Sequence, residues 1–133
     1  MQSTQSCRMF LVFSHALTAA QRADAKARWG VEAFVALPSE LQTSWSNIPP
    51  QIEHLDAYLD PIMVWLREQL RAGDVVLVQG DFGATCQVVR RVESLGAVAV
   101  YATTRRTVIE THEGDQVIKR SLFEHVAFRR YTP

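Results

Sequence analysis

The chain has 133 residues, and 47% of them are hydrophobic, which is enough to build the core of one compact domain. Its 14 basic and 14 acidic residues cancel, so no overall field attracts duplex nucleic acid and any anion site has to be local. No apolar run approaches the roughly twenty residues of a membrane span, so no membrane partner is expected. The two cysteines are too few for a disulfide framework. We therefore expect one cytoplasmic domain over residues 1–133, with residues 1–8 as a flexible lead-in.

The chain opens with a strand, a helix and a second strand. The apolar residues 9–13 predict a strand that is buried on both faces, and residues 32–37 predict the next strand. Between them, Thr18 is a good N-cap for a helix over residues 19–29, and Gly30 ends that helix.

Two helical patterns follow. Ser39 and Gln42 resemble a capping box, which indicates a short helix. Apolar residues between positions 52 and 66 then recur every three or four positions, as on one face of an amphipathic helix. Pro61 interrupts this stripe and Asp60 would suit an N-cap, so we expect either a kink or two consecutive helices.

The centre of the chain has the order of a βαβ unit. Residues 75–78 form an apolar β-branched run, a helical pattern leads from Ala84 to Leu95, Gly96 ends it, and a second β-branched run begins at Val98. This order predicts an α/β fold, with a Rossmann-like, mainly parallel sheet flanked by helices.

The last quarter of the chain predicts a C-terminal β-hairpin extension. Residues 107–112 and 116–121 are β-rich and surround a short turn at residues 113–115, and residues 123–131 suit a further strand. The polar and basic character of this region favours an edge, a flap or a dimer contact.

Polar residues follow three of the predicted strands, and parallel sheets bind ligands outside the carboxyl ends of their strands. We therefore expect the three turns to converge on one ligand. Adjacent arginines and the N–H groups at a helix start favour an anionic ligand such as phosphate. The predicted ligand-binding residues are Ser14, Gln79, Gly80, Asp81, Phe82, Gly83, Thr103 and Thr104.

The turn at residues 79–83 has neither the dinucleotide-binding fingerprint nor the lysine of a P-loop. Its glycines let a ligand approach the backbone; alternatively, they only permit a tight turn. Asp81 suits a helix cap or a contact with a sugar hydroxyl, and Gln79 suits a ribose or a base edge.

Arg105, Arg106 and His15 are the predicted catalytic residues. A guanidinium group stabilises charge that develops on a phosphoryl group, although a single arginine at such a turn is as often structural. His15 is a candidate to orient or protonate an oxygen; alternatively, it only caps a helix or faces solvent. The spacing of the other histidines and the cysteines does not favour a metal site.

Several longer motifs lie between Met9 and Tyr131. They are Phe13-Ser14-His15-Ala16-Leu17-Thr18, Leu37-Pro38, Leu41-Gln42, Trp45-Ser46-Asn47-Ile48-Pro49-Pro50, Leu77-Val78-Gln79-Gly80-Asp81-Phe82-Gly83-Ala84, Tyr101-Ala102-Thr103-Thr104-Arg105-Arg106 and Phe128-Arg129-Arg130-Tyr131. Together they resemble a small CRISPR-associated family, the member of the Csx series numbered twenty, which is similar to the Rossmann-fold sensors of type III CRISPR systems.

The resemblance implies a stand-alone ring nuclease that destroys a cyclic oligoadenylate messenger. It also implies a homodimer that holds the ligand across its two-fold axis, with cyclic tetra-adenylate as the favoured substrate. The neighbouring 2′-hydroxyl would attack the phosphodiester and leave a 2′,3′-cyclic phosphate, so no metal or other cofactor is expected. The alternatives are a sensor or sponge that binds the ring without cutting it, and a nucleotide-binding regulatory protein whose arginines serve a subunit interface.

Overall fold

A five-stranded sheet in the order β2-β1-β3-β4-β5 organises the computed structural model, which describes residues 6–133. Strands β1 to β4 are parallel, and β5 returns antiparallel to β4. The elements, in chain order, are β1 (Cys7–Val12), α1 (Ala19–Trp29), β2 (Val31–Ala36), α2 (Ser39–Ser46), α3 (Asp56–Gln69), β3 (Val75–Val78), α4 (Phe82–Ser94), β4 (Val98–Glu113) and β5 (Gln116–Arg130). The predicted α/β fold with a C-terminal hairpin is confirmed.

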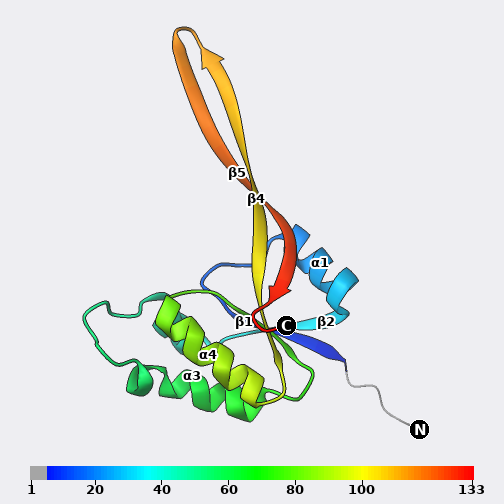
Figure 1. The fold of residues 1–133 in the computed structure, drawn as a ribbon, viewed down its shortest axis with the longest axis vertical. Coiled ribbons are helices and arrows are strands. Elements are labelled where there is room, and N and C mark those ends of the chain that lie inside the picture. Colours follow the sequence, from blue (N-terminus) through cyan, green and yellow to red (C-terminus); the bar gives the residue numbers. More distant parts are fainter. Residues whose placement is uncertain (1–5) are drawn as a thin grey trace.

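Helices cover both faces of the sheet (Figure 1). On the α1 face, Leu17 and Ala25 pack with Met9, whereas on the face of α2, α3 and α4 the side chain of Trp45 belongs to the same core as Phe10. Met9 and Phe10 are fully buried in different cores because successive residues of a strand point to opposite faces. The prediction that this strand is buried on both faces is confirmed. No helix among residues 6–133 is long and apolar enough to cross a membrane.

Helix α1 begins and ends as predicted. The Thr18 hydroxyl accepts a hydrogen bond from the Gln21 N–H at 3.1 Å, and the Gln21 side chain accepts one from the Thr18 N–H at 2.9 Å. This capping box satisfies two backbone donors at the start of the helix. Gly30 ends the helix with φ 65°, a left-handed conformation that glycine adopts without strain.

The predicted capping box of the next helix is wrong. Pro38 precedes α2 without any side-chain cap, and Ser39 lies inside the helix. Gln42 instead donates from its amide to the carbonyl oxygen of Phe13 at 2.6 Å. The local sequence pattern assigned the Gln42 amide to the start of its own helix. In the structure, this amide instead binds Phe13, which lies just beyond the last paired residue of β1.

The predicted second N-cap at Asp60 is also wrong. Helix α3 starts at Asp56, with Leu55 at the cap position, and runs through Pro61 to Gln69. Proline removes one backbone hydrogen bond, but Ile62 and Leu66 are fully buried against the sheet and hold the segment helical. Ile52, the first residue of the predicted stripe, precedes the helix and is exposed.

The sheet begins earlier than the predicted lead-in allows. Residues 1–5 of that lead-in lie outside the described residues, but Cys7 and Arg8 already belong to β1. The Arg8 guanidinium donates to the buried carboxylate of Asp74 at 2.7 Å. Because Asp74 directly precedes β3, this pair fixes the first strand beside the central one.

The largest difference from prediction is the length of β4. Residues 103–106 are not a turn that ends a strand, because β4 continues past them to Glu113 and pairs with β5 over its whole length beyond Val100. Val100 is the last residue of β4 in register with β3, and beyond it β4 is paired with β5 alone, on the side away from β3. The result is a long ribbon that projects from the body (Figure 1). Residues 104–125 are called the arm below.

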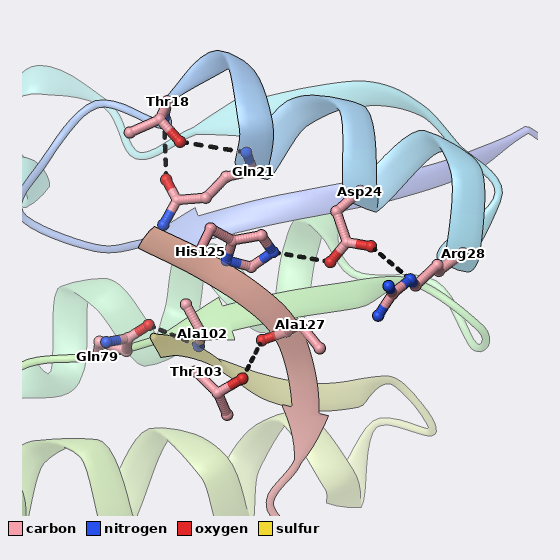
Figure 2. Close-up of polar contacts among 9 residues, drawn as sticks. All are labelled: Thr18, Gln21, Asp24, Arg28, Gln79, Ala102, Thr103, His125 and Ala127. Carbon is pink, nitrogen blue, oxygen red and sulfur yellow. Dashed lines mark hydrogen bonds and ion pairs between the residues drawn. The ribbon is translucent and has the colours of Figure 1, made fainter. Parts of the chain in front are cut away.

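A β-bulge lies where the arm leaves the body. Thr103 is opposite Ala127 and Thr104 is opposite His125, so Val126 is an extra residue in β5. The imidazole Nε2 of His125 lies 2.7 Å from the carboxylate of Asp24 on α1, and Arg28 holds the second oxygen of that carboxylate at 3.0 Å (Figure 2). Both side chains of the histidine–aspartate pair are buried, with 4% and 10% exposed.

The Asp24–His125 pair should anchor the arm measurably. In a double-mutant cycle with Asp24→Ala and His125→Ala, we expect a coupling free energy of about 1–3 kcal/mol, because the hydrogen bond is buried and involves a carboxylate. The same cycle on the exposed pair Glu110–Lys119, whose atoms are 3.6 Å apart, should give about 0.5 kcal/mol or less. Urea unfolding of the parent and the six variants measures both. Equal coupling in the two cycles would contradict the anchoring role.

Candidate functional site

The carboxyl ends of β1 and β3 lie side by side and form the centre of the candidate site. The N–H of Gln79 donates to the carbonyl of Val12 at 3.1 Å, so the residues that follow the two strands are adjacent. They line a cavity of about 190 Å³. The lining residues are Phe13, Ser14, His15, Gln79 and Gly80. The structure thus brings two of the three predicted turns together.

His15 is exposed in this cavity, and its ring packs edge-on against Phe13 with the centroids 5.4 Å apart. No carboxylate among residues 6–133 is within salt-bridge distance of it. The imidazole is therefore open to a ligand from its polar side, and the neighbouring Ser14 hydroxyl is also exposed.

A second cavity of about 390 Å³ lies beside the first and shares Gln79 and Gly80 with it. Its other lining residues are Phe82, Thr85, Cys86, Tyr101 and Tyr131. Phe82 is 92% exposed at the start of α4, an unusual position for a large apolar ring in a folded protein. The cavity therefore combines a free aromatic ring with two tyrosines.

The tyrosines form a fixed wall of this aromatic cavity. The rings of Tyr101 and Tyr131 lie 4.9 Å apart, and Arg129 donates to the Tyr101 hydroxyl at 3.0 Å. The Tyr131 hydroxyl donates to the carbonyl of Val78. Burial raises the pKa of Tyr131, so this hydroxyl keeps its proton and its hydrogen bond at neutral pH. Thr85 adds a buried hydroxyl that has no hydrogen-bond partner within residues 6–133.

Gln79 is the structural centre of the site. Its side-chain oxygen accepts from the N–H of Ala102 at 2.8 Å (Figure 2), and its backbone carbonyl accepts from the Trp45 indole at 3.0 Å. The predicted acceptor for a ribose or a base edge is therefore already engaged. The amide NH₂ group remains as the donor for a ligand.

Gly80 is required by packing rather than by an unusual backbone angle. Its φ is not positive, but a Cβ atom there would lie 2.8 Å from the Trp45 ring. Gly83 has more room, since a Cβ atom would meet Leu55 at 3.4 Å. The local turn alone does not require glycine at position 80, because the constraint comes from a side chain 35 positions away in the sequence.

Asp81 caps α4. Its carboxylate accepts from the N–H of Ala84 at 3.0 Å, and its backbone carbonyl accepts from the N–H of Thr85 at 2.8 Å. The backbone N–H groups of Phe82 and Gly83, in the first turn, have no such partner within residues 6–133 and carry the positive end of the helix dipole. This turn offers a phosphate group two donors, whereas the carboxylate of Asp81 limits how closely an anion can approach.

The third predicted turn does not converge on the site. The Thr103 hydroxyl donates to Ala127 at 2.9 Å, and Thr104 lines a different cavity, of about 600 Å³, between α1 and the arm. At about 3.3 Å per strand residue, Arg105 and Arg106 lie about 10–13 Å beyond Ala102, the residue level with Gln79. Arg106 donates to the Ser121 hydroxyl across the arm at 3.0 Å. Both arginines are exposed.

Four residues of this region escaped prediction. Tyr101 and Tyr131 carried a signal, because aromatic residues next to a polar strand end suit a ligand wall. Asp24 and His125 carried none, since 101 positions separate them. Within residues 6–133, no three His, Cys, Asp or Glu side chains are grouped so that they could hold a metal ion.

The chain belongs to the Uncharacterized protein MJ1673 family, which it matches over residues 7–129. It is 41% identical over 126 residues to the Uncharacterized protein MJ1673 of Methanocaldococcus jannaschii, and the alignment covers 95% of this chain and 98% of the relative. The family match spans the whole arm and every lining residue of the two cavities except Tyr131. No solved structure matches the chain.

The contact between Gly80 and Trp45 should be visible in stability. We expect Gly80→Ala to lower the free energy of unfolding by about 1–3 kcal/mol, because the added methyl group overlaps the indole. Gly83→Ala is the matched control: it should be neutral or slightly stabilising, since alanine favours the helix. Urea unfolding followed by tryptophan fluorescence measures both variants. Equal losses in the two would show that the Trp45 contact is not the constraint.

Proposed function

We propose that this member of the MJ1673 family is a metal-independent ring nuclease that binds a cyclic oligoadenylate, with cyclic tetra-adenylate as its first substrate. The observation that carries the proposal is the pair of cavities that share Gln79 and Gly80 at one sheet edge. One is polar and the other is aromatic, which matches the two chemistries of a nucleotide. Cleavage of the ring would end type III CRISPR signalling.

The polar cavity suits the sugar–phosphate part of the ligand. The Ser14 hydroxyl and the free amide of Gln79 are donors to phosphate oxygens. His15 is the one titratable side chain that lines this cavity. A phosphodiester seated here has donors on one side and an imidazole beside its ribose.

The aromatic cavity suits a purine base. Phe82 presents a free ring for stacking, and Tyr101 and Tyr131 line the same cavity. Stacking of a base on an aromatic side chain contributes about 1–3 kcal/mol to binding.

The chemical step needs little from the protein beyond position and charge. The ribose 2′-oxygen forms a bond to the neighbouring phosphorus atom, and the bond from phosphorus to the 5′-oxygen breaks. The 2′-hydroxyl loses its proton, and the leaving 5′-oxygen gains one. His15 is the proposed group for one of these transfers, and the products are linear fragments with a 2′,3′-cyclic phosphate.

The proposed active form is a homodimer. A cyclic ligand with two-fold symmetry matches an isologous interface, in which each residue occurs twice around the axis. The resemblance to the Csx-series family supports the same arrangement. The free aromatic ring of Phe82 at the edge of the sheet supports it as well, because a second subunit and the ligand together would cover it.

A sensor or sponge that binds the ring without cutting it is the second candidate. The observation in its favour is that no carboxylate within residues 6–133 forms an ion pair with His15 that would orient its ring. The two candidates share the same cavities and differ only in the fate of the bound ring.

Incubation with cyclic tri-, tetra- and hexa-adenylate in excess EDTA tests the proposal directly. We expect cyclic tetra-adenylate to be converted to di-adenylates with 2′,3′-cyclic phosphate ends. Cleavage should persist in EDTA, because the candidate site contains only one carboxylate, and it caps a helix. Mass spectrometry identifies the products. Intact ring released after tight binding would instead support the sponge, and rescue by manganese or magnesium would overturn the metal-independent step.

Substitutions should separate binding from cleavage. Phe82→Ala should weaken ligand binding about tenfold to a hundredfold through lost stacking, and Phe82→Trp should restore it. His15→Ala should slow single-turnover cleavage about a hundredfold, with a smaller effect on affinity. His54→Ala, which removes an exposed histidine outside both cavities, is the control. A parental cleavage rate in His15→Ala would remove the proposed proton-transfer role.

A further inference from the structure

The arm rises from the carboxyl ends of the parallel strands (Figure 1), and the residues that line both cavities follow those ends. It is a two-stranded ribbon, and α1 contacts only its base, through His125. Isolated two-stranded hairpins are at best marginally stable in water. A ribbon of this length is therefore expected to be covered by another surface.

The arm exposes apolar side chains on both faces. Residues that are directly opposite in the two strands share a face, so Phe123 and Val108 lie on one face while Leu122 and Ile109 lie on the other. All four are exposed, and Phe123 is 67% exposed. A surface that is apolar on both sides fits a groove or a clasp rather than a flat contact with solvent.

The charges of the arm favour a second copy of this chain as the partner. The arm has four basic and four acidic residues, so it presents no net charge to nucleic acid. The charges run from Arg105 and Arg106 at the base to Glu113 and Asp115 at the tip. The body presents the opposite sign in the groove of about 490 Å³ between α3 and α4. This groove is lined by Arg90 and Arg91, neither of which has a salt bridge within residues 6–133, and by one carboxylate, Asp56, so its net charge is positive.

The arginines at the base of the arm lie too far out to serve their own site. At about 3.3 Å per residue they are about 10–13 Å beyond the sheet edge, past a ligand seated in the cavities of the same subunit. In the proposed dimer, the carboxyl ends of the two sheets face each other across one ligand. Arginines that project this far from one subunit then lie at the sheet of the other subunit. Arg106 is already held in place, because both Nε and one terminal nitrogen donate to Ser121.

We propose that the arm acts in trans: each subunit clasps its partner with the arm, and Arg105 and Arg106 complete the partner's site. Arg105 and Arg106 project from opposite faces of the ribbon, so one of the two guanidinium groups stabilises the charge that develops on the phosphorus atom during attack by the 2′-oxygen. Each site is then built from the cavities of one subunit and the arginines of the other. This inference rests on the proposed ring-nuclease function.

Complementation between two inactive variants tests the exchange. One variant is His15→Ala, and the other combines Arg105→Ala with Arg106→Ala. Each homodimer should cleave cyclic tetra-adenylate about a hundredfold more slowly than the parent. Co-expression with two different affinity tags and sequential purification on both gives the heterodimer. If the arm acts in trans, the heterodimer has one intact site and should cleave at about half the parental rate.

Each result decides the matter. An inactive heterodimer beside an active parent overturns the trans arrangement alone, because in cis both subunits of the heterodimer are defective. A parental rate in the arginine double variant, or a monomeric parent by light scattering with ligand present, also overturns it. A parent that does not cleave the ring overturns the proposed function together with this inference. Arg67→Ala with Arg71→Ala, which removes the same charge from the far end of α3, should leave the rate unchanged.

Discussion

The hydrogen bond from the Ala102 N–H to the Gln79 side chain marks the point at which the sheet divides. Up to this level, β3 and β4 are neighbours in a parallel sheet. Beyond it, β3 has ended. The side-chain oxygen of Gln79 accepts the hydrogen bond of one more β4 N–H group, in place of a further β3 residue. β4 can therefore continue into the arm without a buried unpaired donor, while the chain after Gln79 turns away and opens the cavities. Both the site and the arm depend on this one hydrogen bond, in which a side-chain oxygen takes the place of a backbone carbonyl.

The same turn is held from the other side by Trp45. Its indole donates to the Gln79 carbonyl, and its ring occupies the space in which any side chain at position 80 would lie. Gln79 is thus fixed at both its backbone and its side chain. A rigid first turn of α4 keeps the exposed ring of Phe82 beside the two tyrosines. Preorganisation of this kind reduces the entropy that is lost when a ligand is bound.

Elements with strong local signals were predictable from the sequence. Thr18 and Gly30 bracket α1, and the parallel order of the strands is enough to place Ser14 and His15 beside the turn after β3. The extent of β4 was not predictable, because two threonines followed by two arginines have the composition of a strand end in a buried sheet. Here they belong to an exposed ribbon, whose strands have no core face and so no apolar period. Pairing over long separations, as between Asp24 and His125, leaves no local pattern at all.

The single extra residue at Val126 fixes how the arm can change length. Beyond the bulge, each position of β5 is committed to one face of the ribbon, with His125 directed at α1. Insertion of one residue near the base of β4 would move every later residue of that strand to the opposite face and would bring Arg105 where Arg106 now lies. A change of length at the base therefore keeps both faces of the arm only if two residues are added to or removed from each strand, a step of about 7 Å, whereas residues added at the tip leave the base unchanged.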